Sequence, residues 1–431
     1  MFGTSGIRGI YGKDITGELA FGVANAFAEK RLVSGRDLRK SGVALRDAAA
    51  EGTAEAGADF IDLGIVPTPT VALATKRHDC RGIMITASHN PPEYNGFKLI
   101  ENSREIGKEL EKQIERDFRK RRAGRMKGSC YFDCDAVDAH KELIRSLIDA
   151  RTIGKKRPKI LVDCNGAACA ITPSLLTDLG CRVTSINASF ECFNRPSEPR
   201  EENISYLGGL VKDSGADFAV AHDGDGDRCA IVDDKGEMLP LDVQLAMMIE
   251  HEISGSRAKV VSTVEASLMI RDVVRDAGGK IEITPVGSTH VSEMLEKKGA
   301  LFGGEPCGEY VYKDGVHVPD AVLAAAKFAE IFSVKGRFSG LKKRYKQHSM
   351  ARERFPAKDR HAAMEKIKRE MDVEGEIRDD DGIRIDEDDG WLLVRASGTE
   401  PVIRLTMEYK TKQKLRKRKD EIAKLIEKWT G

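Results

Sequence analysis

The strongest constraint on the fold is a repeated alternation of short apolar runs with amphipathic stretches. Apolar runs of strand length are followed by segments with helical spacing, and this series begins again twice along the chain. The restarts fall at residues 159–164 (KILVDC) and 258–264 (AKVVSTV). Strands that alternate with helices favour parallel pairing inside layered α/β units. The sequence therefore predicts three related α/β units, which form a degenerate internal repeat.

Two changes of texture divide the chain further. Residues 151–159 (RTIGKKRPK) are basic and contain a proline, which is typical of a linker. After about residue 338, a basic connector (KKRYKQHSMARERFPAKDR) leads to strand-like residues and a charged terminal helix. At 431 residues the chain is also too long for one core. We therefore expect an α/β protein whose sheets are mixed but largely parallel, with α/β domains at residues 1–150, 151–252 and 253–345 and a smaller α+β domain at 346–431.

Composition limits the class of partner. Lys and Arg number 70 against 69 Asp and Glu, so there is no overall basic excess for nucleic acid, and an anionic ligand needs a local cluster. The sequence contains no run of about 18 apolar residues, so it predicts no membrane span, and the N-terminus does not resemble a secretory signal. Nine cysteines without a C-x-x-C pair favour free thiols over zinc or disulfides. We expect a cytoplasmic protein; its oligomeric state stays open.

The run HDGDGDR is the strongest sign of a metal site. It follows a strand-like segment and carries Asp223, Asp225 and Asp227, whose oxygens suit a hard divalent cation. An EF-hand is disfavoured because its Gly and Glu positions hold Arg228 and Asp234. A haloacid-type phosphatase motif is disfavoured because Asp227 takes its Thr/Val position. A solvated acidic turn is the remaining alternative, and Mn²⁺ or Ca²⁺ stays open beside Mg²⁺.

Two further loops favour anion and sugar binding. In RASGTEP, Arg395, Ser397 and Thr399 combine charge, hydroxyls and backbone N–H groups into a nest suited to phosphate. An ordinary strand-to-helix turn is the alternative. In GEPCGEY, Glu305 and Glu309 flank a glycine-rich loop, and such carboxylates accept hydrogen bonds from sugar hydroxyls. An exposed hairpin explains this second loop equally well.

The segment TASHNPPEYNGFK places Ser88 at the end of a buried strand and two prolines behind it. A hydrolase that used His89 as base is disfavoured, because neighbours on extended backbone point to opposite sides and no G-x-S-x-G elbow is present. A serine that carries a phosphoryl group fits better. The aspartates would supply its cation, and Lys98 or Arg8 would shuttle a proton or stabilise the transferring group.

Taken together and in order, these segments resemble the α-D-phosphohexomutase family, which includes phosphoglucomutase, phosphomannomutase and phosphoglucosamine mutase. The resemblance covers essentially the whole chain through the motifs TSGIRG, GRDLRKSG, LGIVPTPT, TASHNPPEYNGFK, DGDGDR, TPVG, GGEPCGE and RASGTEP. It implies four domains around a central cleft, three of them related and the fourth smaller. The boundaries drawn above agree with that arrangement.

The resemblance also implies a reversible phosphoryl transfer. Ser88 would rest as phosphoserine, donate its phosphoryl group to a sugar phosphate, and recover a phosphoryl group from a bisphosphorylated intermediate that turns around. A hexose 1,6-bisphosphate would act as activator. The implied catalytic residues are Ser88, Arg8, His89 and Lys98. One Mg²⁺ would be held by Ser88, Asp223, Asp225 and Asp227. The implied substrate-binding residues are Arg228, Glu305, Cys307, Glu309, Arg395, Ser397, Gly398 and Thr399, the last four around the distal phosphate.

Two departures from the family pattern bear on the substrate. The sugar loop is commonly G-E-x-S-G-H, whereas this chain has Cys307 and Glu309 at the Ser and His positions. Ser288 stands where Asp is usual. A carboxylate at residue 309 favours a cationic 2-amino sugar, so we expect a mutase that interconverts glucosamine 6- and 1-phosphate. Phosphoglucomutase or phosphomannomutase activity, a metal-dependent phosphatase and a non-catalytic sugar-phosphate-binding paralogue are the alternatives.

Overall fold

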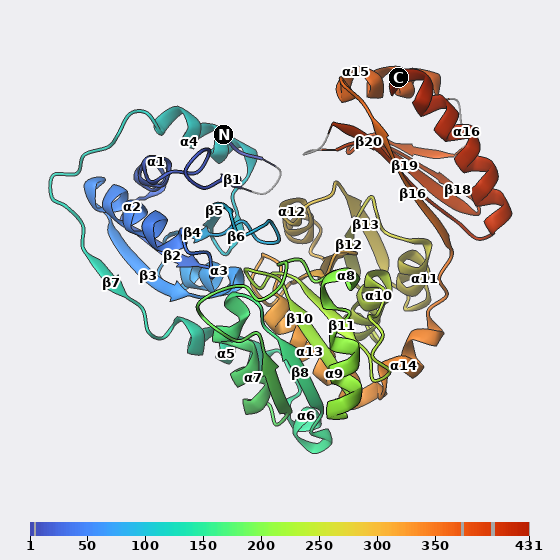
Figure 1. The fold of residues 1–431 in the computed structure, drawn as a ribbon, viewed down its shortest axis with the longest axis horizontal. Helices are drawn as coiled ribbons and strands as arrows, with labels where there is room; N and C mark the ends of the chain where they lie inside the picture. Colours follow the sequence, from blue (N-terminus) through green and yellow to red (C-terminus); the bar gives the residue numbers. More distant parts are fainter. Residues whose placement is uncertain (4–5, 372–374, 398–400, 431) are drawn as a thin grey trace.

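The computed structural model describes residues 1–431 except 4–5, 372–374, 398–400 and 431. Four sheets follow one another along the chain in an arc, from the N-terminal unit in blue to the C-terminal unit in red (Figure 1). The predicted class, three α/β units and a smaller α+β unit, is confirmed. In the described part of the chain, no helix is both long and apolar enough to cross a membrane.

The first unit is built on a seven-stranded mixed sheet. Its strands are β1 (Ile7–Ile10), β2 (Arg31–Arg36), β3 (Asp59–Ile65), β4 (Arg81–Ile85), β5 (Tyr94–Glu101), β6 (Arg104–Glu105) and β7 (Cys130–Phe132). Its helices are α1 (Gly17–Phe27), α2 (Gly42–Glu55), α3 (Thr68–Arg77), α4 (Lys108–Asp117) and α5 (Ala136–Ser146). Strands β2, β3, β4 and β7 are parallel, whereas β5 runs antiparallel to β4. The chain therefore turns back on itself directly after β4.

The second unit has the sheet order β11-β10-β8-β9. Its elements are α6 (Ala150–Lys156), β8 (Lys159–Asp163), α7 (Thr172–Asp178), β9 (Arg182–Ile186), α8 (Glu201–Ile204), α9 (Leu207–Ser214), β10 (Phe218–His222) and β11 (Cys229–Val232). The prediction of a linker at residues 151–159 is wrong, because this stretch forms α6 and the start of β8. The Asp149 carboxylate caps α6 by accepting hydrogen bonds from the backbone N–H groups of Arg151 and Thr152.

The third unit repeats this arrangement with the order β13-β12-β14-β15. Its elements are α10 (Leu241–Glu252), β12 (Lys259–Thr263), α11 (Leu268–Asp276), β13 (Lys280–Thr284), α12 (Ser288–Lys298), β14 (Phe302–Glu305), β15 (Glu309–Tyr312), α13 (Ala321–Lys335) and α14 (Phe338–Leu341). In all three units a parallel strand is followed by an antiparallel partner. The loops between them carry Ser88, the three aspartates and Cys307, so the repeat places the candidate motifs at equivalent positions.

The fourth unit is an antiparallel sheet of order β16-β20-β19-β18-β17 covered by helices. Its elements are β16 (Ser349–Pro356), α15 (Arg360–Glu370), β17 (Glu376–Arg378), β18 (Ile383–Glu387), β19 (Gly390–Ala396), β20 (Val402–Tyr409) and α16 (Lys412–Thr430). The predicted connector is in part wrong, because β16 lies within it. The charged residues that suggested a connector alternate along a partly exposed strand.

A buried histidine joins the first and third units. His140 on α5 lies 2.8 Å from the Thr70 hydroxyl through Nδ1 and 2.9 Å from the Asp320 carboxylate through Nε2. Asp320 also caps α13 by accepting from the N–H groups of Val322 and Leu323. The side chains of all three bonded residues are buried, so both contacts are shielded from water.

We predict that His140→Ala lowers the free energy of unfolding by about 2–4 kcal/mol, because it leaves two buried polar groups without their partner. The midpoint of urea denaturation, followed by circular dichroism, measures this loss. The exposed His361 on α15 offers the matched change His361→Ala, which should leave the midpoint in place. An unchanged midpoint in the His140 variant would contradict this role for the junction.

Candidate active site

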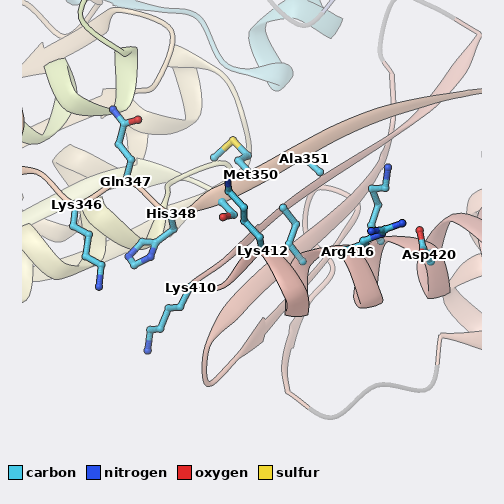
Figure 2. Close-up of a pocket in the computed structure, with 12 residues that line it drawn as sticks. Lys346, Gln347, His348, Met350, Ala351, Lys410, Lys412, Arg416 and Asp420 are labelled. Carbon is cyan, nitrogen blue, oxygen red and sulfur yellow. The ribbon is translucent and has the colours of Figure 1, made fainter.

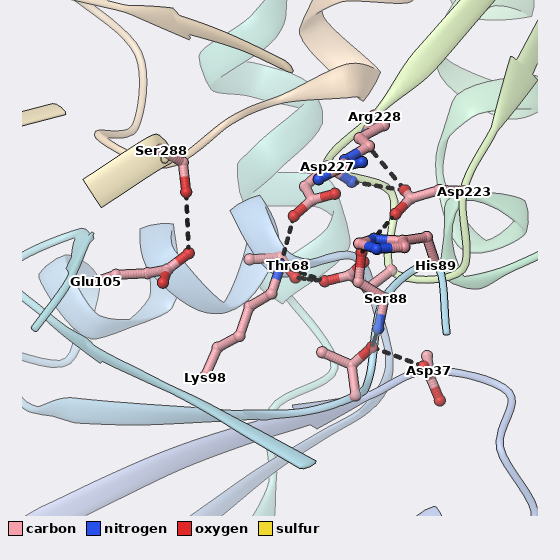
Figure 3. A network of polar contacts seen from close by, with 12 residues as sticks. Asp37, Thr68, Ser88, His89, Lys98, Glu105, Asp223, Asp227, Arg228 and Ser288 are labelled. Atoms are coloured by element: carbon pink, nitrogen blue, oxygen red, sulfur yellow. Dashed lines mark hydrogen bonds and ion pairs between the residues drawn. The ribbon is translucent and has the colours of Figure 1, made fainter. Parts of the chain in front are cut away.

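The loop after β4 meets the loop after β10 at the boundary between the first two units. Ser88 Oγ donates a hydrogen bond to Asp223 Oδ2 at 2.9 Å (Figure 3). Thr68, at the start of α3, donates to Asp225 through its hydroxyl at 2.6 Å and through its backbone N–H at 2.8 Å. Residues more than a hundred positions apart in the sequence thus share one buried site.

The alternating glycines of DGDGD make this approach possible. A Cβ on Gly224 would lie 2.8 Å from the Ser88 carbonyl oxygen, and one on Gly226 would lie 2.7 Å from Pro67. Gly226 also has φ of +68°, a conformation that favours glycine. A side chain on Gly224 would push the two loops apart, and one on Gly226 would clash with the segment before α3.

A buried arginine holds the serine loop in shape. Arg39 pairs with Asp37 at 3.0 Å and donates to the carbonyl oxygens of Ser88 at 2.9 Å and Asn90 and Tyr94 at 2.8 Å. Ser88 itself has φ of +49°, which costs a non-glycine residue about 1–2 kcal/mol. The guanidinium offsets this strain by satisfying several loop carbonyls at once. Arg39 was not predicted as a site residue, although the charged motif GRDLRKSG that contains it is visible in the sequence.

Asp223, Asp225 and Asp227 form a site that fits a divalent cation. All three are buried, and one carboxylate oxygen of each lies within 4.8 Å of the others. Among the described residues, Asp225 Oδ1 and Asp227 Oδ1 are buried without a hydrogen-bond partner. Unpaired buried carboxylate oxygens are costly, and a cation bound by oxygen ligands would remove that cost. The donor set therefore fits a hard metal ion.

The charges in this cluster are strongly coupled. Burial, followed by the charges of the neighbouring aspartates, raises the pKa of Asp223 well above its usual value, and the pKa of Asp227 is raised for the same reasons. Lys98 Nζ lies 2.7 Å from Asp225 and also pairs with Asp227. Burial disfavours the charged lysine, but the two carboxylates outweigh it and raise the Lys98 pKa, so this side chain stays cationic.

His89 and Arg8 lie beside the serine. His89 Nδ1 is 3.4 Å from Ser88 Oγ, so the expectation that the two side chains point apart is wrong. The expectation assumed extended backbone, whereas Ser88 is left-handed. Burial, then the charges of Arg228 and Arg8, lower the pKa of His89 to about 2, which leaves the ring neutral. Arg8, on β1, donates to the Asn90 side chain at 3.5 Å.

The loop between β14 and β15 places Glu309 against Arg228. Glu309 accepts from Arg228 Nε at 2.8 Å, and Glu305 accepts from the Gly287 N–H at 3.1 Å. One carboxylate oxygen of Glu305, one of Glu309 and the Cys307 sulfur lie within 4.8 Å of one another. Burial, then the Glu309 charge, raises the pKa of Glu305, while burial raises that of the Cys307 thiol and keeps it protonated. The Glu309 carboxylate, from which a preference for a 2-amino sugar was predicted, is thus paired with a guanidinium.

The candidate phosphate loop of the fourth unit is joined to the third. Arg395 donates to Asp381 at 3.0 Å, and the same carboxylate accepts from the Val286 N–H at 2.9 Å. Ser397 is buried, and its N–H bonds to the Val402 carbonyl oxygen. The predicted Gly398 and Thr399 lie outside the described residues. Asp381 thus links the Arg395 side chain to the loop before α12.

A separate basic groove lies away from these loops. It has a volume of about 880 Å³ and runs between the connector before β16 and helix α16 (Figure 2). Its cationic lining residues are Lys346, Lys410, Lys412, Arg416 and Lys419. None of the predicted site residues lines this groove, so it is not part of the candidate active site.

Comparison with known proteins identifies the class. Family models of phosphoglucomutase/phosphomannomutase match α/β/α domain I at residues 1–125, domain II at 138–236, domain III at 242–349 and the C-terminal domain at 350–425. Together the fold and the relatives define a phosphohexomutase, an isomerase that relocates a phosphoryl group within a sugar. The chain belongs to the phosphoglucomutase/phosphomannomutase family.

Individual relatives span essentially the whole chain. A Methanosarcina barkeri protein named "Probable phosphoglucosamine mutase" is 38% identical over 442 residues, which cover 99% of this chain and 98% of that protein. A Thermococcus kodakarensis "Phosphoglucomutase/phosphomannomutase" is 37% identical over 448 residues, covering 99% and 98%. A Burkholderia thailandensis family protein of known structure has a TM-score of 0.86 at 26% identity, covering 99% of this chain and 96% of that one.

We predict that Mg²⁺ raises the thermal unfolding temperature of the protein and that Asp227→Asn weakens this ion's binding by at least about tenfold. Binding should also weaken as the pH falls, because protons compete for carboxylates whose pKa values are raised. Thermal shift and calorimetric titration measure both effects. The exposed Asp213 on α9 provides the control Asp213→Asn, and equal binding by the two variants would contradict the site.

Proposed function

We propose that this protein interconverts the 6- and 1-phosphates of a hexosamine through a phosphorylated Ser88 and a bisphosphorylated sugar intermediate. The observation that carries the proposal is the 2.9 Å contact between Ser88 Oγ and Asp223 inside a buried cluster of three carboxylates. A serine hydroxyl placed against a cation site is suited to hold a phosphoryl group, because the cation neutralises the charge of its oxygens.

Each half-reaction exchanges one phosphorus–oxygen bond for another. As the bond between phosphorus and Ser88 Oγ breaks, a bond to a sugar hydroxyl oxygen forms, and the hydroxyl proton passes to the released serine oxygen. Bound Mg²⁺, held by Asp223, Asp225 and Asp227, would supply charge stabilisation to the transferring group. Lys98 and Arg8 are placed to stabilise the same group, and the raised pKa of Lys98 favours that role over proton shuttling.

The fourth unit would hold the phosphate that does not react. Arg395, Ser397, Gly398 and Thr399 are proposed to bind it, and Asp381 orients the Arg395 guanidinium toward the third unit. Binding energy from this remote phosphate positions the sugar for in-line transfer. After the first transfer the bisphosphate would turn around, so that each phosphate takes the other's place.

Glucosamine phosphate is the proposed substrate. Glu309 pairs with Arg228, whereas Glu305 accepts a hydrogen bond from the Gly287 N–H and is the carboxyl that would ionise against a 2-ammonium group. The Arg228 pair also favours a second candidate, phosphoglucomutase/phosphomannomutase activity, because it offsets the Glu309 charge. A phosphatase would instead release inorganic phosphate from the same serine.

The nine cysteines are all free, which supports a reducing, cytoplasmic setting.

We predict that Ser88→Ala lowers isomerisation by at least about a thousandfold, because the phosphoryl carrier is lost. Intact-mass measurement should show a phosphate adduct on the wild-type protein that is absent from this variant. Ser146→Ala, on the exposed side of α5, serves as the control and should retain both activity and adduct. Unchanged isomerisation in the Ser88 variant would rule out the phosphoserine route, and net phosphate release would favour the phosphatase.

We further predict that, with a trace of hexose 1,6-bisphosphate and Mg²⁺, glucosamine 6-phosphate gives the highest kcat/KM, followed by glucose and mannose 6-phosphates. The reason is that Glu305 and Glu309 can stabilise a 2-ammonium group, which glucose and mannose phosphates lack. Coupled assays for each 1-phosphate product measure the order. If glucosamine 6-phosphate ranks last, the charge argument for residues 305 and 309 is wrong, while the mutase reaction itself stands.

A further inference from the structure

A buried carboxylate from the first unit lies beside the candidate site and has no role in the reaction described so far. Glu105 on β6 pairs in register with Ile100, which places it on the same face of the sheet as Lys98. It is 8% exposed, and within the described part of the chain it forms no ion pair. Its Oε1 accepts a hydrogen bond from Ser288 Oγ of the third unit at 3.4 Å (Figure 3).

The charges around Glu105 are those of the candidate active site. After burial, which raises its pKa, the strongest influences on this carboxyl come from Lys98 and Arg8, followed by Asp227 and Glu309. Glu105 therefore belongs to the same group of charges as Lys98 and Asp227 (Figure 3). A buried carboxylate that accepts one long hydrogen bond and forms no ion pair is costly unless a ligand supplies a partner.

The contact between the first and third units does not need this carboxylate. The neighbouring Arg104 pairs with Glu296 at 2.7 Å, and the His317 N–H donates to the Ser103 carbonyl oxygen at 3.0 Å. These bonds hold β6 and the residue before it against the third unit without Glu105. Glu105 is thus available for a ligand that enters between the two units.

We propose that Glu105 is a specificity-determining residue that binds the 2-ammonium group of the hexosamine phosphate. This inference rests on the proposed function. The amino group is carried by the carbon next to C1, so it lies close to the reacting oxygen when O1 is phosphorylated, beside Lys98 and Arg8. When O6 reacts, the amino group lies toward the other end of the sugar. Glu105 therefore serves the half-reaction at O1, in which the acceptor is the 6-phosphate.

The test compares Glu105→Gln with Glu109→Gln, which removes an equal charge from an exposed position on α4. For Glu105→Gln, kcat/KM with glucosamine 6-phosphate should fall about tenfold or more, and with glucose 6-phosphate by less than about twofold. Single turnovers of the phosphorylated enzyme should slow for glucosamine 6-phosphate and not for glucosamine 1-phosphate. Glu109→Gln should match the wild type throughout.

A second variant separates loss of the carboxylate from other damage that Glu105→Gln causes. Because Ser288 Oγ lies 3.4 Å from Glu105 Oε1, Ser288→Asp returns a carboxylate to the same space. The double variant Glu105→Gln/Ser288→Asp should regain preference for the amino sugar, with thermal unfolding used to check that both proteins fold. Equal loss with both sugars, or absence of rescue in a folded double variant, would overturn the proposal. Loss of isomerisation of every sugar by the wild type would instead refute the proposed function.

Discussion

The whole site depends on close contact between two loops that belong to different units. Ser88 reaches Asp223, Thr68 reaches Asp225, and Lys98 lies between Asp225 and Asp227. Each of these bonds crosses the boundary between the first and second units. The second unit also supplies Ser197, whose hydroxyl donates to the Ser88 carbonyl oxygen at 2.9 Å. Any shift of one unit against the other would separate the serine from the carboxylates, so the packing of the two units is itself part of the chemistry.

The internal repeat explains how one molecule gathers three kinds of loop. In each α/β unit the chain leaves a parallel strand, turns, and returns as an antiparallel neighbour. The carboxyl ends of such strands are where α/β proteins place ligands. The serine, the aspartates and the cysteine of the sugar loop occupy this turn in successive units. Three copies of one element therefore present three different chemistries, and the fourth unit adds Arg395, which Asp381 links to the Val286 N–H of the third unit.

Much of the fold and the site could be predicted because the informative residues are local in sequence. The alternation of strands and helices, the DGDGD run and the SHNPP loop are each visible in a short window. The contacts of Arg39, Thr68 and Glu105 were not predictable, because their partners lie far away in the chain or are backbone carbonyls. The prediction of a linker at residues 151–159 failed because Asp149 caps a helix in this basic stretch. The prediction that His89 points away from Ser88 failed because the left-handed backbone of Ser88 turns the next side chain toward Ser88 Oγ.

The central claim is that Ser88 carries the phosphoryl group that the sugar receives. Labelled glucose 1,6-bisphosphate, added with Mg²⁺, tests it most directly, followed by a chase with unlabelled hexosamine 6-phosphate. If Ser88 is the carrier, label appears on the Ser88 peptide, leaves it during the chase at the rate of turnover, and is recovered in sugar phosphate. Label on another residue, or isomerisation that proceeds while Ser88 stays unlabelled, would contradict it.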